Sequence, residues 1–99
     1  MPSDERTVCH TPTPGKQPTS IPTWKYQLLH KLIQKVVPRK SPGIAAKELP
    51  KLVRDELSQV EQSRLGSMNW HVTTVKLNME VDGELSRVPK LKPHHLVRT

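Results

Sequence analysis

Hydrophobic positions recur with helical spacing between Thr23 and Val37. They lie three or four residues apart on one side, while the other side is basic or polar. The apolar side consists of Tyr26, Leu28, Leu29, Leu32, Ile33, Val36 and Val37. We expect a first helix that is capped by Thr23 and ends before Pro38, because a residue that precedes proline disfavours the helical conformation.

A second helical stretch lies between Ile44 and Gln62, after a loop over residues 39–43. Its apolar positions are Leu49, Leu52, Val53, Leu57 and Val60. Pro50 falls inside this stretch, and proline is tolerated in the first turn of a helix. The helix therefore begins near Leu49, or a short preceding turn is kinked against it. Residues 59–66 are largely polar and lead to a third element.

The third element, over residues 67–83, has two interpretations. Ser67 can cap a helix that starts at Met68, and Gly83 can take the left-handed conformation that ends it. The alternative is a β-hairpin, because residues 75–81 alternate between apolar and polar and Asp82-Gly83 is a strong turn signal. The cap and the unalternating step over residues 72–75 favour the helix.

The remaining segments complete an α+β prediction. Residues 84–88 suit a strand, residues 89–93 the tip of a wing, and residues 95–98 a final strand. Residues 1–22 hold five of the ten prolines, so we expect an extended or disordered arm before a domain over residues 23–99. The predicted fold is winged helix-turn-helix-like, with about three helices and a short β-hairpin wing.

The facing apolar stripes of the three helices predict one core. Little other apolar material is available, since only 33% of the 99 residues are hydrophobic. The expected core residues are Leu29, Ile33, Leu49, Val53, Leu57, Val72, Val75 and Met79.

Composition narrows the class of function. A chain of this length makes one small domain, which argues against an enzyme with several sites. Sixteen Lys and Arg against nine Asp and Glu give a formal charge of +7, which favours contact with polyanions such as nucleic acid. A soluble domain that is merely basic is the simpler interpretation of the same charge.

The sequence indicates a cytoplasmic protein. Cys9 is the single cysteine, so no internal disulfide can form, which fits a reducing compartment. No apolar run approaches the roughly 20 residues that a membrane span needs. The first residues lack the layout of a signal peptide, so export is not indicated.

Catalytic and metal chemistry find little support. Cys9-His10 and His94-His95 lack the spacing of a zinc site, and residues 14–16 lack the first half of a phosphate-binding loop. Ser and Thr residues have no placed histidine and acid beside them. We expect a non-enzymatic protein without metal, cofactor or small-molecule substrate.

Two segments carry a resemblance to a known family. Residues 66–77, GSMNWHVTTVKL, followed by Met79-Glu80 and residues 83–88, GELSRV, resemble the C-terminal signature of a family of small, uncharacterised bacterial proteins. Residues 14–17, PGKQ, with Ile21 and Tyr26, are similar to the N-terminal segment of the same family. The resemblance covers roughly residues 14–98. It implies a winged-helix-like layout and no established function.

A winged helix with this charge predicts contact with double-stranded DNA. On the third helix, Thr73, Thr74 and Asn78 are candidates to reach base edges, and Lys76 to reach a phosphate or a guanine. Basic side chains of the wing would lie along the phosphate backbone; they are Arg87, Lys90, Lys92 and Arg98. The expected role is a DNA-binding or DNA-associated regulator.

An apolar second face supports a different class of function. Trp70, Leu77 and Val81 lie together about half a turn from the core stripe, whereas a face that reads a groove is normally polar. These side chains would pack against the arm at residues 14–22, a second copy of the chain or a protein partner. The alternative function is therefore a protein-interaction or structural module.

Overall fold

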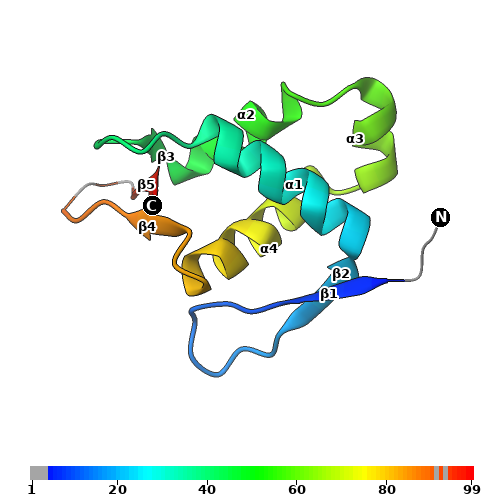
Figure 1. Cartoon of the computed structure of the whole chain (residues 1–99), viewed down its shortest axis with the longest axis horizontal. Coiled ribbons are helices and arrows are strands. Elements are labelled where there is room, and N and C mark those ends of the chain that lie inside the picture. Colours follow the sequence, from blue (N-terminus) through cyan, green and yellow to red (C-terminus); the bar gives the residue numbers. More distant parts are fainter. Residues whose placement is uncertain (1–4, 91, 93) are drawn as a thin grey trace.

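The computed structural model describes residues 5–90, 92 and 94–99, which form an α+β fold (Figure 1). The described residues contain four α-helices, a single 3-10 turn and two small antiparallel sheets. In chain order the elements are β1 (Arg6–Cys9), β2 (Thr19–Pro22), α1 (Thr23–Val36), β3 (Ile44–Ala45), η1 (Ala46–Glu48), α2 (Leu49–Arg54), α3 (Gln59–Leu65), α4 (Met68–Val81), β4 (Leu85–Arg87) and β5 (His95–Arg98).

Helix α1 occupies the segment expected of the first helix. It ends at Val36, and Val37 is extended because Pro38 follows it. The expected cap is wrong, because Thr23 is the first helical residue and Pro22 precedes the helix without a side-chain cap. The Thr23 hydroxyl lies 2.9 Å from the hydroxyl of Thr7 instead, which joins the helix to β1.

The second helical stretch is divided into two helices, so the expected number of three helices is wrong. Helix α2 begins at Leu49 with Pro50 in its first turn, as one of the two alternatives proposed. A separate helix, α3, begins after Ser58, whose hydroxyl accepts a hydrogen bond from the Glu61 backbone at 3.1 Å. Val60 belongs to α3 and is 67% exposed, so it is not part of the apolar stripe.

Residues 68–81 form a helix, α4, and the hairpin interpretation of this segment is wrong. Gly83 has a φ of 80°, and the Glu84 backbone N–H donates to the Met79 carbonyl at 2.8 Å. This hydrogen bond ends the helix, and strand β4 begins two residues after Gly83. Ser67 stands at the N-cap but forms no side-chain capping bond.

The C-terminal sheet has the order β3-β5-β4, and all its pairs are antiparallel. Its central strand β5 matches the expected final strand, and β4 lies within the expected first strand of the wing. Leu96 of β5 stands opposite Ile44 on one side and Arg87 on the other. Strand β3 was not expected. Residues 91 and 93, in the expected wing tip, lie outside the described residues.

The expected N-terminal arm is folded as a β-hairpin over residues 6–22. Strands β1 and β2 pair antiparallel, with Thr7 opposite Ile21 and Cys9 opposite Thr19. Cys9 and Ile21 are buried in the same core as the helices. Residues 6–22 therefore differ from the expected extended or disordered arm, because Cys9 and Ile21 are covered where the hairpin packs on α1 and α4. Residues 1–4 lie outside the described residues.

All eight expected core residues are buried, which confirms the prediction of the core. They are joined by seven buried residues outside the expected core set: Cys9, Ile21, Leu32, Val37, Leu65, Leu85 and Leu96. The core therefore extends from the hairpin through the helices to the C-terminal sheet.

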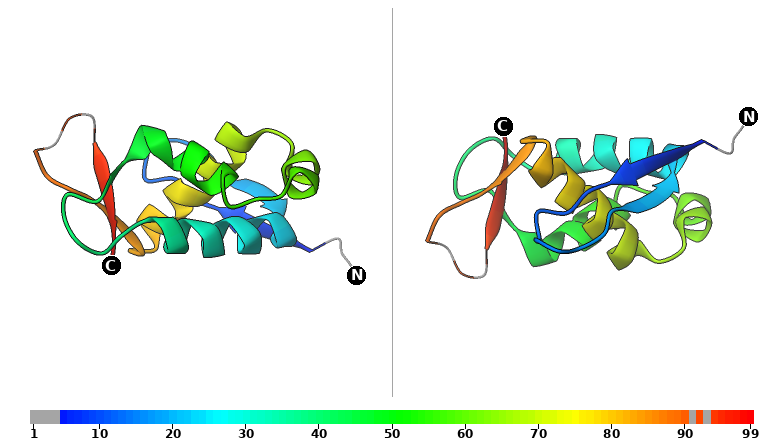
Figure 2. Two further views of the ribbon diagram at one scale, coloured as in Figure 1. Left: turned by 90° about the horizontal axis from the view of Figure 1, so that it is seen from above. Right: turned by 90° about the horizontal axis from the view of Figure 1, so that it is seen from below.

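Helix α4 lies between two layers of the molecule (Figures 1 and 2). Helices α1 and α2 pack against one side of it, and the β1–β2 hairpin crosses it on the side that is seen from below. The C-terminal sheet lies at one end of the molecule and α3 at the other. The packing of these neighbours therefore determines which side chains of α4 remain accessible to a ligand.

Candidate nucleic-acid interface on helix α4

Helix α4 has two outward stripes about 100° apart around its axis. The polar stripe consists of Asn69, Thr73, Lys76 and Glu80. The mixed stripe consists of Trp70, Thr74, Leu77 and Val81. The polar stripe runs beside α2 and the mixed stripe runs beside the β1–β2 hairpin, as their surroundings show.

A groove of about 250 Å³ separates the polar stripe from the start of α2. We name it the α2–α4 groove; its lining includes Lys47 and Pro50 on one wall and Asn69, Thr73 and Lys76 on the other. Lys47, Asn69 and Thr73 are exposed. The groove thus brings a cation and two hydrogen-bonding side chains to one surface.

Lys76 is not free on that surface. It is 8% exposed, and its Nζ lies 3.1 Å from Oε2 of Glu80. The other carboxylate oxygen of Glu80 accepts a hydrogen bond from Arg87 Nε at 2.8 Å. Glu80 therefore holds both cations and connects the polar stripe to β4.

His94 lies beside this charged cluster. Burial lowers the pKa of its imidazole from the ordinary value of 6.5, and the positive charges of Arg87 and Lys76 lower it further against the opposing effect of Glu80. Its Nε2 is buried and has no hydrogen-bond partner among the described residues. His94 is therefore held in its neutral form by its surroundings.

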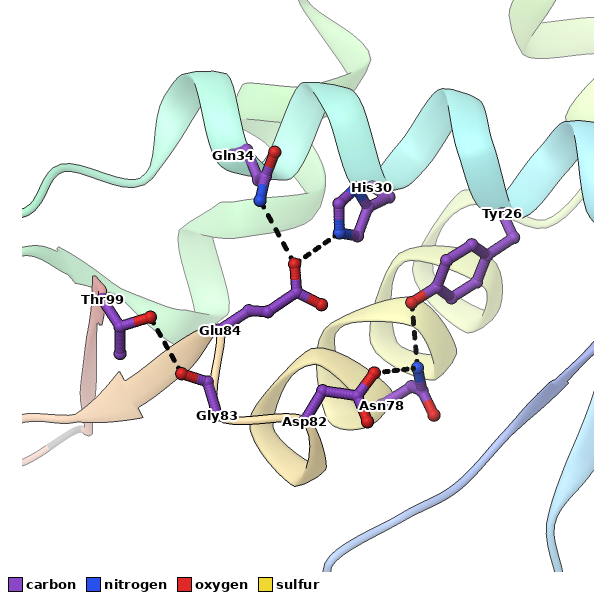
Figure 3. A network of polar contacts seen from close by, with 8 residues as sticks. All are labelled: Tyr26, His30, Gln34, Asn78, Asp82, Gly83, Glu84 and Thr99. Atoms are coloured by element: carbon purple, nitrogen blue, oxygen red, sulfur yellow. Dashed lines mark hydrogen bonds and ion pairs between the residues drawn. The ribbon is translucent and has the colours of Figure 1, made fainter.

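Asn78, expected to reach a base edge, is a structural residue (Figure 3). It is 5% exposed, and its Oδ1 accepts a hydrogen bond from the backbone N–H of His10 at 2.8 Å. Its amide nitrogen donates to Tyr26 Oη at 2.9 Å and to Asp82 Oδ2 at 3.2 Å. The expectation that Asn78 projects outward is wrong, because the hairpin and α1 enclose it.

Two further candidates are partly engaged within the chain. The Thr74 hydroxyl donates to the Trp70 carbonyl at 2.8 Å, one turn earlier in α4. Arg98 donates from Nε to the Val37 carbonyl at 3.2 Å, near the end of α1. Of the basic residues expected in the wing, Lys90 and Lys92 are exposed, and Arg87 is exposed although Glu80 binds it.

The base of the β4–β5 hairpin is fixed to α1 (Figure 3). Oε1 of Glu84 lies 2.6 Å from His30 Nε2 and accepts a hydrogen bond from the Gln34 amide at 3.2 Å. The Thr99 hydroxyl donates to the Gly83 carbonyl at 2.8 Å on the other side of the same turn. The orientation of this hairpin relative to α4 is therefore set by side chains of α1.

The mixed stripe is partly covered by the chain itself. Residues of the β1–β2 hairpin and of α4 enclose a groove of about 450 Å³, which we name the hairpin groove. Trp70, Thr74 and Leu77 line it. Trp70 remains 48% exposed and Val81 45% exposed. The three expected apolar residues thus form neither a fully covered face nor one continuous open patch.

Several residues of these surfaces were absent from the expected sites. Lys47 could have been found from Pro50, which marks the first turn of α2 and so places Lys47 just before it. Asn69 precedes Thr73 by one helical turn and belongs to the same face. Lys16 and Gln17 belong to residues 14–22, which the sequence offered as one possible cover of the mixed stripe, but their positions in the groove depend on the folded hairpin.

Across the described part of the chain, no helix has the length and apolar character required to span a membrane. Within residues 5–90, 92 and 94–99, no three histidine, cysteine or carboxylate side chains come together as a metal-binding group.

Comparison with known proteins identifies a family and no function. Residues 6–96 match the model of a family of unknown function, DUF6958, and the chain belongs to this family. The match includes the β1–β2 hairpin as well as the helices and most of the C-terminal sheet. Neither a curated protein nor a solved structure shows a significant match to the chain.

Proposed function

We propose that this member of a family of unknown function is a winged-helix module that binds double-stranded DNA through α4. The observation that carries the proposal is the strand order β3-β5-β4 in a chain whose helices and strands from α1 onward are α1, β3, α2, α3, α4, β4 and β5. A winged helix has this order of elements, with α3 as an addition between its second and third helices. In this interpretation, α4 is the recognition helix and the β4–β5 hairpin is the wing.

The polar stripe of α4 supplies the groups that would read bases. Asn69 and Thr73 are exposed, one turn apart, and their side chains can donate and accept hydrogen bonds at base edges in a major groove. Lys76 and Asn78 do not belong to this set, because Glu80 and Tyr26 engage them within the fold. The proposed reading face is thus smaller than the one expected from the sequence.

Cations flank this face on both sides. Lys47 stands across the α2–α4 groove from Thr73, at the beginning of the helix that precedes the recognition helix in this scheme. Lys90 and Lys92 are exposed in the turn between β4 and β5. Side chains in these positions contact phosphates, which fix the register of a recognition helix without reading sequence. The formal charge of +7 supports the same contact.

Fluorescence anisotropy of the full chain with a labelled duplex pool of about two helical turns tests the proposal. We expect binding at low salt, with log K falling linearly as log salt rises. The combined change of Lys47, Lys90 and Lys92 to Ala should reduce the steepness of this dependence by about 0.9 for each phosphate that the variant no longer neutralises. Arg64→Ala removes an exposed cation from α3, distant from the wing, and should leave it unchanged.

Asn69→Ala combined with Thr73→Ala should reduce selectivity among duplex sequences while the salt dependence persists. Absence of binding at low salt would overturn the proposal. So would an equal reduction from Arg64→Ala, since that result would indicate only a general attraction between a basic protein and DNA.

The exposure of Trp70 and Val81 supports a second candidate, a protein-interaction module. Large apolar side chains that remain nearly half exposed on one helix are typical of contact surfaces. If two copies associate through this surface, light scattering should detect a dimer, and Val81→Glu should dissociate it. A monomer at all concentrations, together with duplex binding, would favour the first proposal.

A further inference from the structure

The hairpin groove has the size of a site for a small molecule. Its volume of about 450 Å³ lies in the range of roughly 300–1,000 Å³ that is usual for ligand pockets. Its two walls come from segments distant in the sequence, the β1–β2 hairpin and residues 69–77 of α4. A concave surface of this size suits a compact ligand better than the flat contact of a protein partner.

An aromatic ring and apolar side chains are part of the lining of this groove. Trp70, Leu77 and Cys9 line it, and burial raises the pKa of the Cys9 thiol, so that the thiol stays neutral. The Trp70 ring meets the neighbouring His71 edge-on, with 4.9 Å between ring centroids, and the side chain is nearly half exposed. A planar ring bound here would stack on the indole.

The lining of the groove also contains polar and positively charged side chains. Lys16 lines it beside Gly15, whose φ of 81° places the turn of the hairpin there. The lining contains no Asp or Glu, and Lys16 has no ion pair with another described residue. Gln17, Thr19 and Thr73 add hydrogen-bonding side chains. The charge of the groove therefore favours an anion.

We propose that the hairpin groove binds a small aromatic carboxylate, with its ring against Trp70 and its carboxylate directed to Lys16. A carboxylate accepts hydrogen bonds from an ammonium and from hydroxyl groups, and both kinds of group line this groove. A larger ligand of the same class, such as an indole carboxylate, fits the same description. The assignment of this site does not rest on the proposed DNA contact.

Asn69 and Thr73 connect the two surfaces, because both residues line the hairpin groove and the α2–α4 groove. A ligand in the hairpin groove would touch the side chains that we assign to base contacts. Where the proposed DNA binding holds, the carboxylate should therefore lower the affinity for duplex. Only this coupling rests on the proposed function.

Benzoate is a suitable probe. Its binding is followed by NMR, as chemical-shift changes in the ¹⁵N-labelled full chain without DNA. A fragment of this size binds weakly, so the titration extends to concentrations of about 20 mM. We expect saturable shifts of the Trp70 indole and of amides in residues 10–17, with the Trp24 indole unchanged. The Trp24→Phe variant assigns the two indole signals. Benzamide and cyclohexanecarboxylate, which lack the charge or the aromatic ring, should bind at least roughly tenfold more weakly.

Matched variants separate the two contributions. Lys16→Gln should abolish the preference for benzoate over benzamide, and Trp70→Leu should weaken both roughly tenfold or more. Lys31→Gln removes a cation from the exposed side of α1 and should change neither affinity. The proposal is overturned by shifts that do not saturate, by shifts centred on Trp24, or by a preference that survives Lys16→Gln. Benzoate binding without any duplex binding would uphold this site and reject the DNA contact.

Discussion

The side-chain amide of Asn78 donates a hydrogen bond to the hydroxyl of Tyr26 over 2.9 Å, from α4 to α1. The same amide group accepts the backbone N–H of His10, so three segments meet at one buried side chain. Burial raises the pKa of the Tyr26 hydroxyl, which keeps it neutral in this position. The hydrogen bond from the His10 backbone to Asn78 explains why the β1–β2 hairpin is fixed to α4 rather than extended from it.

Replacing Asn78 by Ala should therefore lower the stability of the fold without removing a side chain that we assign to ligand binding. The change leaves the His10 N–H without its acceptor, and we expect a loss of about 1–3 kcal/mol in the free energy of unfolding. Asn69→Ala removes the same amide from an exposed position of the same helix and should change stability by at most about 0.5 kcal/mol. Urea unfolding of both variants measures the difference. Equal effects would contradict the structural role of Asn78.

Leu57 and Val60 give a second matched pair, because only the first is in the core. Leu57 is 8% exposed and Val60 is 67% exposed. Leu57→Ala should cost about 2–5 kcal/mol, since it removes buried methyl groups and leaves a cavity. Val60→Ala should be nearly neutral. Thermal unfolding followed by circular dichroism reports both values, and an unchanged melting temperature for Leu57→Ala would contradict this assignment of the core.

Gly43 is required for a close approach between the loop that precedes β3 and strand β5. A Cβ atom at this position would lie 1.9 Å from the Leu96 carbonyl oxygen. Gly15 has a similar positive φ but nothing within 4 Å of such an atom, which makes it a control. Gly15→Ala should cost only the roughly 1–2 kcal/mol of a left-handed backbone, and Gly43→Ala clearly more. Equal losses in chemical denaturation would show that the backbone moves to accept the methyl group.

The neutral His94 predicts a loss of stability in acid. Its pKa is lowered in the folded protein, whereas in the unfolded chain it titrates near 6.5. As the pH falls below 6.5, the unfolded chain binds a proton that the folded protein excludes, so the free energy of unfolding decreases. In the His94→Gln variant, the contribution of this imidazole to the decrease in the free energy of unfolding should disappear. Urea titrations on both sides of this pH test it, and identical pH dependences of the two proteins would refute it.

The strongest sequence patterns predicted their elements well. The periodic run before Pro38 gave the end of α1, and Gly83 gave the end of α4, because each carries both a periodic pattern and a stop signal. The apolar–polar alternation over residues 75–81 also suggested a β-hairpin, but Val75 and Met79 are both buried on one face of the helix. Packing on α1 and α2 decided between the two.

Helix α3 carried a local signal that the apolar pattern obscured. Ser58 and Glu61 form a capping box, and the two hydrogen bonds between them start a new helix after Leu57. Val60 occupied a position of the preceding stripe and suggested one continuous helix. Helix α3 has little apolar periodicity of its own, because it is mostly polar and Leu65 is its single buried residue.

The β1–β2 hairpin was missed for a different reason. Its strands have four residues each, the residues 10–18 that connect them hold three prolines, and the burial of the strands depends on α1 and α4, which follow later in the chain. The same dependence explains Lys76. A helical wheel places it on the outer face, but in the fold it is 8% exposed and its ammonium pairs with Glu80, which also binds Arg87 of β4.

The central position of β5 sets the order in which the C-terminal sheet can assemble. Strands β3 and β4 are both bonded to β5 and not to each other, although they precede it in the chain. During synthesis, a chain that has reached Val88 contains the residues of all four helices, but neither strand has its partner. Strands β4 and β5 are close in the chain, whereas pairing β3 with β5 closes a much longer loop, which is entropically costly. The β4–β5 hairpin can therefore form before β3 joins the sheet.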